Sequence, residues 1–274
     1  MTINCKGKLI DLSTPKVMGI INVTPNSFYD GGKHVDEKSI LLQVEKMLLE
    51  GATFIDIGGY SSKPNAEFVS EEEELQRILP IVQKVLNEFP ETIISIDTFR
   101  SKVAKETLES GAAMINDISA GNLDDAMLQT IADIQVPYIM MHMRGTPQTM
   151  QKMTHYENII KEMTFYFSER VAKARSLGIN DLIIDPGFGF AKTLEQNFEV
   201  LNKLELFQIL ELPLLAGVSR KSMIYKTLDT TAEFALNGTT SLNTISLMKG
   251  AKILRVHDVK EAVECVKLYN QLNH

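Results

Sequence analysis

The feature that most constrains the fold of this chain is a series of eight short apolar runs, separated by stretches with helical periodicity. Each run is nearly continuous in apolar residues, as expected when both faces of a parallel strand are buried. Such an alternation predicts an α/β protein with a parallel sheet. The runs are Val17–Val23, Phe54–Gly58, Ile93–Asp97, Met114–Ile118, Tyr138–His142, Leu182–Asp185, Leu214–Val218 and Ile253–Val256.

The joints between predicted helices and strands repeat along the chain. Gly51-Ala52, Gly111-Ala112 and Gly250-Ala251 each close a helix and open a strand, which is what a repeated βα unit leaves in a sequence. Eight such units in about 250 residues match a (β/α)8 barrel, whereas an open doubly wound sheet more often carries a G-x-G-x-x-G turn. We therefore predict a single (β/α)8 TIM barrel domain over residues 1–274, its bottom closed by a short hairpin within Ile3–Leu12.

The composition limits which partners the protein can bind and in which cellular compartment we expect it. Lys and Arg number 28 against 35 Asp and Glu, a net charge of −7, which argues against a broad basic face for nucleic acid or an anionic membrane. Cys5 and Cys265 lie at opposite ends of the chain, so we expect inert thiols rather than a disulfide scaffold. With no basic-then-apolar leader and no apolar run of about 18 residues, the expected location is the cytoplasm.

The polar residues that end the apolar runs form the candidate site, because the active site of such a barrel lies at the C-terminal ends of its strands. Carboxylates such as Asp97 and Asp185 can accept N–H groups from a flat amino-heterocycle, and the Asn116 amide can donate and accept at once. The alternative is that strand-end Asp and Asn residues only cap turns. The strand-end residues are Asn22, Asp56, Asp97, Asn116, His142, Asp185, Ser219, Arg255 and His257.

A second group of residues is cationic in a chain whose net charge is negative. Ser219-Arg220-Lys221-Ser222 follows the seventh run, while Arg255 and His257 share one face of the eighth. The loops after strands seven and eight are the usual phosphate-binding position of these barrels, so the sequence predicts an anion site there. The alternative is that Arg220 or Arg255 only extends along the surface into solvent.

Eight motifs, in order along the chain, closely resemble those of the dihydropteroate synthase family from about Val17 to Val266. One such motif is modest evidence, but eight at barrel spacing are highly specific. They are Met18-Gly19-Ile20-Ile21-Asn22-Val23-Thr24-Pro25 with Phe28 and Asp30-Gly31-Gly32, Asp56-Ile57-Gly58-Gly59 with Ser61 and Pro64, Ile96-Asp97-Thr98, Ile115-Asn116-Asp117-Ile118, Met141-His142-Met143-Arg144-Gly145-Thr146-Pro147, Asp185-Pro186-Gly187-Phe188-Gly189-Phe190, Ser219-Arg220-Lys221-Ser222 and Arg255-Val256-His257-Asp258-Val259.

The resemblance implies a transferase of folate synthesis and a role for each matching residue. Such an enzyme joins 4-aminobenzoate to the methyl carbon of a dihydropterin diphosphate, releasing diphosphate and forming dihydropteroate. The implied cofactor is Mg²⁺, held by Asn22, and the implied catalytic residues are Asp97, Lys221 and Asp30. The resemblance further implies pterin binding by Asp97, Asn116, Asp185 and Lys221, diphosphate binding by Asn22, Lys63, Arg255 and His257, and aminobenzoate binding by Phe28, Ser62, Pro64, Phe190, Ser219 and Ser222.

Two loop positions depart from the family pattern. Asn26 stands where the family usually has Asp, and Lys63 where it usually has Arg, so one carboxylate and one planar guanidinium are lost. We interpret both as variation within an active enzyme. The alternatives are a pterin-binding methyltransferase, which should lack the anion cluster, a pterin-binding module without catalysis, and a barrel of unrelated function.

The remaining features carry no predicted ligand. Met140, Met141 and Met143 around His142 are interpreted as packing, and Glu71–Glu74 after the predicted N-cap Ser70 as a complement to a helix dipole. The resemblance also implies a homodimer. Its candidate contacts are apolar positions of the last two helices, if exposed: Leu242, Leu247 and Val263.

Overall fold

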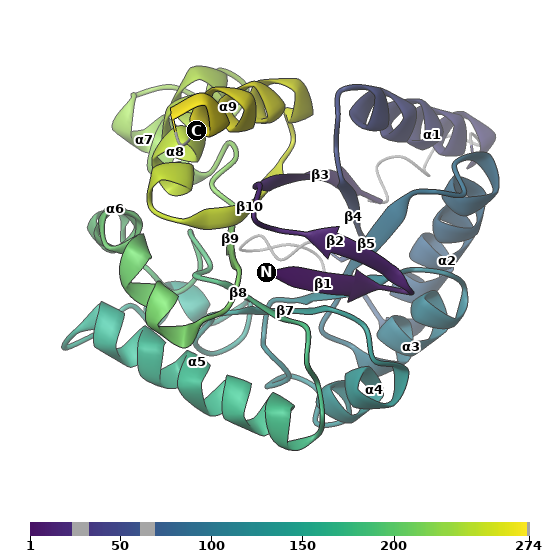
Figure 1. The fold of residues 1–274 in the computed structure, drawn as a ribbon, viewed down its shortest axis with the longest axis horizontal. Helices are drawn as coiled ribbons and strands as arrows, with labels where there is room; N and C mark the ends of the chain where they lie inside the picture. The colour runs from purple at the N-terminus through teal and green to yellow at the C-terminus, as the bar shows by residue number, and fades with distance from the viewer. Residues whose placement is uncertain (24–32, 61–68, 273–274) are drawn as a thin grey trace.

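Eight parallel strands close into a barrel, with the helices on its outer side (Figure 1). The protein is described by a computed structural model covering residues 1–23, 33–60 and 69–272. Neighbouring barrel strands follow the chain order, and the last strand pairs with the first to close the ring. The barrel strands are β3 (Lys16–Asn22), β4 (Phe54–Gly58), β5 (Ile93–Asp97), β6 (Met114–Asp117), β7 (Tyr138–Met141), β8 (Leu182–Asp185), β9 (Leu214–Ala216) and β10 (Ala251–Val256).

Helices connect successive strands and cover the barrel. Three of the described helices begin with side-chain caps. The Ser70 and Asn158 side chains accept hydrogen bonds from the backbone N–H groups of Glu73 and Lys161, and Thr193 forms a capping box with Gln196. The helices are α1 (Lys33–Leu49), α2 (Glu71–Glu88), α3 (Ser101–Glu109), α4 (Met127–Ile134), α5 (Ile159–Ser176), α6 (Leu194–Asn202), α7 (Ser222–Thr227), α8 (Leu236–Met248) and α9 (Val259–Leu272), with short 3₁₀ helices η2 (Met150–Lys152) and η3 (Leu204–Leu210).

The inner face of the barrel changes from apolar to polar along the strands. Phe54 near the start of β4 and Ile183 in β8 belong to one buried apolar cluster. Because strand side chains alternate between two faces, the residues two positions later, Asp56 and Asp185, share that inner face. The alternation therefore places the polar residues toward the C-terminal ends of the strands.

The opposite end of the barrel is closed by an N-terminal hairpin, as predicted. It pairs β1 (Thr2–Cys5) with β2 (Lys8–Asp11) antiparallel, and Lys6 and Gly7 at its turn have positive φ angles of 51° and 87°, as a tight two-residue hairpin turn requires. Figure 1 shows the hairpin crossing the centre of the ring. It buries four side chains against the apolar cluster inside the barrel: Ile3, Cys5, Ile10 and Leu12.

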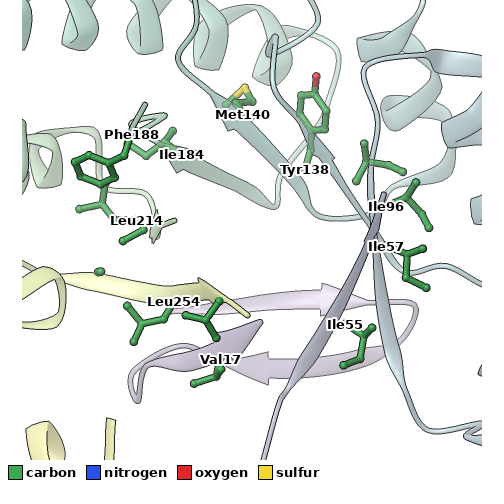
Figure 2. Packing of buried hydrophobic residues seen from close by; sticks show 14 of the residues in the cluster. Val17, Ile55, Ile57, Ile96, Tyr138, Met140, Ile184, Phe188, Leu214 and Leu254 are labelled. Carbon is green, nitrogen blue, oxygen red and sulfur yellow. The ribbon is translucent and has the colours of Figure 1, made fainter. Parts of the chain in front are cut away.

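A second apolar layer lies between the barrel and its helices. Ile57 of β4 pairs in register with Ile96 of β5, and Phe188 lies near Ile184 and Leu214 (Figure 2). The same cluster includes residues of the surrounding helices, such as Val44. Both faces of the strands are therefore buried, which explains why the predicted strands are mainly apolar. The polar residues of the inner face lie toward the C-terminal ends of the strands.

All eight predicted strands are confirmed, with differences only at their ends. β10 starts before the predicted Ile253, and β9 ends at Ala216 rather than Val218, where the chain turns toward Arg220 with a φ of 54°. The candidate dimer contacts depended on exposure, and one of the three does not meet that condition. Leu247 is fully buried because it packs into the core, whereas Leu242 and Val263 are half-buried.

None of the helices that the structure describes combines the length and the apolarity needed to cross a membrane.

Candidate active site

A cavity of about 730 Å³ opens at the C-terminal ends of the barrel strands. It is formed by residues at the ends of β3, β5 and β10 and by the segments that follow β8 and β9. This volume lies within the range of small-molecule sites. The described residues that line it are Ile20, Asn22, Tyr60, Asp97, Met150, Phe188, Gly189, Phe190, Gly217, Ser219, Arg220, Lys221, Ser222, Tyr225, Ala232, Glu233, Arg255 and His257.

Arg255 joins the carboxylates of two other strands inside the barrel. Its Nε donates to Asp56 Oδ2 at 2.5 Å, and its Nη2 donates to Asp97 Oδ2 at 2.6 Å. The Asn116 amide Nδ2 donates to the same Asp56 oxygen at 3.0 Å. Asp56 is fully buried, so its charge depends on these partners. Residues of β4, β5, β6 and β10 thus form one hydrogen-bonded network.

Burial and mutual attraction set the charges of this network. Burial raises the pKa of Asp97 to about 7, although Arg255 acts to lower it. Burial also acts to lower the pKa of Arg255, but the negative charges of Asp56 and Asp97 outweigh it, and the pKa of Arg255 is raised. Arg255 therefore stays charged, while Asp97 can exchange a proton near neutral pH.

Lys221 places a second cation in the cavity. Its Nζ donates to the carbonyl oxygen of Phe188 and lies 5.0 Å from the centroid of the Phe190 ring. Burial lowers the pKa of Lys221 to about 8, against the opposing charge of Asp185. In turn, burial raises the pKa of Asp185, and the charge of Lys221 acts to lower it. Lys221 and Asp185 therefore stabilise each other's charged forms.

Three further polar residues, Ser219, His257 and Asn22, line the same cavity. Ser219 Oγ lies 3.0 Å from His257 Nδ1 and accepts the backbone N–H of His257 at 3.1 Å. Asn22 is exposed at the end of β3 and lines the cavity with them. Together with Arg255, these residues offer the donors that an anionic group needs.

Arg220 lines the cavity but is held by protein partners. Its Nε and Nη2 donate to the two carboxylate oxygens of Asp258, each at 2.8 Å, a bidentate arrangement. Its Nη1 donates to the carbonyl oxygens of Ala232 and Glu233. Arg220 therefore neither extends into solvent nor presents its main donors to a ligand. It fixes the segment that borders the cavity.

The structure brings together most of the predicted ligands that it describes. Asn116 and Asp185 are nearly fully buried and do not line the cavity: Asn116 connects to it through Asp56 and Arg255, and Asp185 interacts with Lys221. The predicted residues that do line the cavity are Asn22, Asp97, Phe190, Ser219, Lys221, Ser222, Arg255 and His257. The predictions for Phe28, Asp30, Ser62, Lys63 and Pro64 lie outside the described residues.

The acidic run at the start of α2 has a further role that the sequence analysis missed. Ser70 caps the helix as predicted, but Glu74 is buried and pairs with Arg100. Arg100 also donates to the carbonyl oxygens of Val69 and Ser70. The run therefore includes a buried ion pair just beyond the end of β5, in addition to charges that suit a helix N-terminus.

Sequence reasoning also missed Lys192, which is buried with its Nζ 3.2 Å from His142 Nδ1. The available signal was a basic residue directly after the glycine-rich segment that follows β8. The interpretation of Met140, Met141 and Met143 as packing is confirmed, since all three are buried.

Comparison with known proteins gives one consistent result. The model of the family described as pterin binding enzyme matches residues 18–257. The dihydropteroate synthase of Escherichia coli (strain K12) is 43% identical over 270 residues, covering 98% of this chain and 95% of that protein. A Yersinia pestis dihydropteroate synthase solved with a sulfonamide drug has a TM-score of 0.93 and 40% identity, covering 100% of this chain and 99% of that one.

A Xanthomonas albilineans dihydropteroate synthase in complex with 7,8-dihydropteroate has a TM-score of 0.89 and 34% identity, covering 100% of this chain and 99% of that one. Likeness in sequence and in fold thus extends over nearly the whole length of these proteins. This chain belongs to the family of pterin-binding enzymes that includes the dihydropteroate synthases.

Proposed function

We propose that this chain is a dihydropteroate synthase, which joins 4-aminobenzoate to a dihydropterin-methyl diphosphate and releases diphosphate. The observation that carries the proposal is the cavity itself, where Asp97 and Lys221 lie on the same surface as Asn22, Arg255 and His257. Groups suited to an amino-heterocycle thus adjoin groups suited to an anion. The relatives named as dihydropteroate synthases support the same reaction.

The carboxylates form the proposed pterin end of the site. Asp97 can accept N–H groups of the pterin from the cavity wall, whereas Asn116 and Asp185, which do not line the cavity, are proposed to complete the pterin end when the ligand is bound. Their negative charge also favours positive charge on the pterin methyl carbon as its bond to oxygen breaks. Preorganised charges of this kind require little rearrangement during the reaction.

The cationic side of the cavity receives the leaving group. The carbon–oxygen bond breaks, its electron pair leaves with the diphosphate, and Arg255 and His257 stabilise that charge. The amine nitrogen of 4-aminobenzoate then forms the new carbon–nitrogen bond and loses one proton to solvent. An aromatic amine is largely unprotonated at neutral pH, so the attack needs no general base from the protein.

The aminobenzoate is proposed to lie beside Phe190, where the ring can stack and the Ser222 hydroxyl can donate to the carboxylate. Both residues line the cavity together with Lys221. The segment containing Phe190 follows β8, and Ser222 begins α7 after β9. Two adjacent loops at the C-terminal end of the barrel therefore supply this part of the site.

Mg²⁺ is the proposed cofactor. Among the residues that the structure describes, no three His, Cys, Asp or Glu side chains gather to hold a metal. Mg²⁺ often keeps several waters and binds through substrate phosphates, so the Asn22 amide oxygen, exposed beside Arg255 and His257, fits it as a single protein ligand. Bound there, the ion supplies positive charge to the departing diphosphate.

Two other functions fit the site less well. A pterin-binding methyltransferase needs no cationic side of the cavity, whereas Arg255, Lys221 and His257 all line this one. A module that binds pterin without catalysis needs no second pocket for an acceptor beside the pterin, but Phe190 and Ser222 are placed to form one. Both alternatives predict pterin binding without diphosphate release in the assay below, which distinguishes them from the proposed synthase.

We also propose that the protein is a cytoplasmic homodimer. A groove between α6 and α8 has a mostly apolar lining, and Met248 at the end of α8 is exposed. The residues that line the groove are Phe198, Glu199, Leu201, Asn202, Leu242 and Ile245. A partner covering this face would remove that apolar surface from water. Sedimentation at micromolar concentration tests the assembly. The two free buried cysteines support a reducing compartment, and cell fractionation tests it.

The experiment that tests the function measures diphosphate release by the purified protein from dihydropterin-methyl diphosphate, with and without 4-aminobenzoate and with and without Mg²⁺. The proposed enzyme sustains diphosphate release over many turnovers only when both 4-aminobenzoate and Mg²⁺ are present. Tight pterin binding without release supports the non-catalytic module, and no binding at all rejects the pterin site.

A further inference from the structure

The segment after β8 has an unusual backbone. Gly187, Gly189 and Ala191 have positive φ angles of 67°, 84° and 48°. Residues other than glycine rarely adopt this backbone conformation. At Gly187 a Cβ atom would also collide with the carbonyl oxygen of His142. Gly187 and Gly189 adopt this conformation without steric cost, whereas Ala191 keeps it only where the surrounding contacts hold the segment in place.

Those contacts come from the buried ammonium group of Lys192. Its Nζ donates to the carbonyl oxygens of Gly187 and Phe190, each at 3.0 Å, and lies 3.2 Å from His142 Nδ1. When Lys192 carries its charge, its ammonium group has three N–H donors and no acceptor, so His142 Nδ1 then accepts the third hydrogen bond. All three donors of Lys192 are therefore used, and Lys192 is only 6% exposed.

The backbone that Lys192 holds carries groups of the cavity. Phe188, between Gly187 and Phe190, provides the carbonyl oxygen that accepts from Lys221. The Phe190 ring faces the same Lys221 ammonium. The Gly187 backbone N–H donates to Asp185 Oδ1 at 2.8 Å. One turn thus contacts Asp185, Lys221 and the aromatic wall of the cavity.

We propose that Lys192 is a positioning residue for substrate binding, which fixes the Gly187–Phe190 turn and through it the Lys221 ammonium and the Phe190 ring. This role rests on the proposed function, because that function assigns the pterin and the aminobenzoate to those two side chains. Lys192 lines no part of the cavity and so acts through the turn.

The burial of a charge at this point supports a specific role. Burial lowers the pKa of Lys192 to about 7, and Asp185 is the carboxylate that opposes this effect, while Lys221 and Arg144 add to it. A methionine of similar length would avoid the cost of burying an ammonium group. A lysine at this position is favoured because only a hydrogen-bond donor can bind the two carbonyl oxygens and the ring nitrogen.

The test compares Lys192→Met with Lys6→Met in steady-state kinetics. Lys6 is a control remote from the site, because its Nζ also donates to a backbone carbonyl, that of Leu108, but the residue is exposed at the turn of the N-terminal hairpin. Lys192→Met is expected to raise the KM for 4-aminobenzoate and lower kcat/KM by about 10- to 100-fold, as misplacement of binding groups does. Lys6→Met should leave both values unchanged.

Three outcomes overturn the proposal. A folded Lys192→Met protein with the kinetic constants of the wild type shows that the lysine only stabilises the fold. Equal losses in Lys192→Met and Lys6→Met point to a general effect of stability. A folded wild type that makes no dihydropteroate refutes the proposed function and this role together, whereas an active wild type with an unaffected variant refutes this role alone.

If Lys192→Met does not fold, His142→Leu tests the same contact, since it removes one of the three acceptors and leaves the lysine in place. The expected result is a smaller rise in the KM for 4-aminobenzoate, with kcat/KM reduced by about 3- to 10-fold. An unchanged KM in folded His142→Leu overturns the proposal.

Discussion

The guanidinium of Arg255 lies 2.6 Å from the carboxylate of Asp97, measured from Nη2 to Oδ2. Arg255 is proposed to bind the diphosphate and Asp97 the pterin, so the two halves of the site share an ion pair. Asp56 accepts from the Arg255 Nε on the other side. The position and the charge of Arg255 are therefore set by carboxylates before any anion binds.

Removing the guanidinium should distinguish the two ends of the substrate. We expect Arg255→Ala to weaken binding of the dihydropterin diphosphate by about 10- to 100-fold, since hydrogen bonds to charged groups contribute about 1.5–3 kcal/mol. Binding of the same pterin with a hydroxyl in place of the diphosphate should weaken less. Calorimetry with both ligands measures the difference, and equal losses would remove Arg255 from the anion site.

Asp56 should contribute to stability through its buried pair with Arg255. We expect Asp56→Ala to lower the free energy of unfolding by about 3 kcal/mol, because it leaves a cation inside the barrel with one partner fewer. Glu91→Ala is the control, since Glu91 pairs with Lys8 on the exposed surface and its loss should cost less than about 1 kcal/mol. Urea denaturation compares them, and similar losses would contradict the account.

Binding of the diphosphate substrate should weaken as the pH rises above about 8, the pKa of Lys221 in the protein without substrate. An anion favours the charged ammonium, so binding above this pH should take up a proton. Lys221→Arg stays charged throughout this range and should lose this pH dependence. Calorimetry in two buffers of different ionisation enthalpy measures the proton. Equal proton uptake by both proteins would assign it to another group.

Asp185 should be needed for its charge rather than for its shape. In Asp185→Asn the amide oxygen can still accept the Gly187 N–H, so we expect a folded protein. The loss of the charge should weaken pterin binding by about 10- to 100-fold. Equilibrium binding of a fluorescent pterin measures this loss, and unchanged affinity would show that Asp185 does not contact the pterin.

The sequence was sufficient to predict the barrel because its signals are local. The run Phe54–Gly58 and its seven counterparts indicate where the strands lie. Because side chains alternate between the two faces of a strand, Phe54 and Asp56 share the inner face. The motifs likewise indicated most of the residues that line the cavity. These predictions needed only the periodicity of a strand and the rule that barrel sites lie at strand C-terminal ends.

The sequence could not predict which charged side chains pair with each other in the folded protein. Arg220 and Arg255 look alike as strand-end cations, yet Arg220 pairs with Asp258 and Arg255 with Asp56 and Asp97. Lys192 appears in sequence as an ordinary basic residue before a helix. Its burial against His142 depends on the turn geometry after β8, which no pattern of residue types specifies.

The most direct test of the central claim is the rate of dihydropteroate formation by the wild type and by Asp97→Asn, measured by mass spectrometry with equal substrates and Mg²⁺. We predict that the wild type forms dihydropteroate and diphosphate in equal amounts, and that Asp97→Asn, folded to the same extent, is at least about 100-fold slower. Equal rates in the two proteins, or no dihydropteroate from the folded wild type, would contradict it.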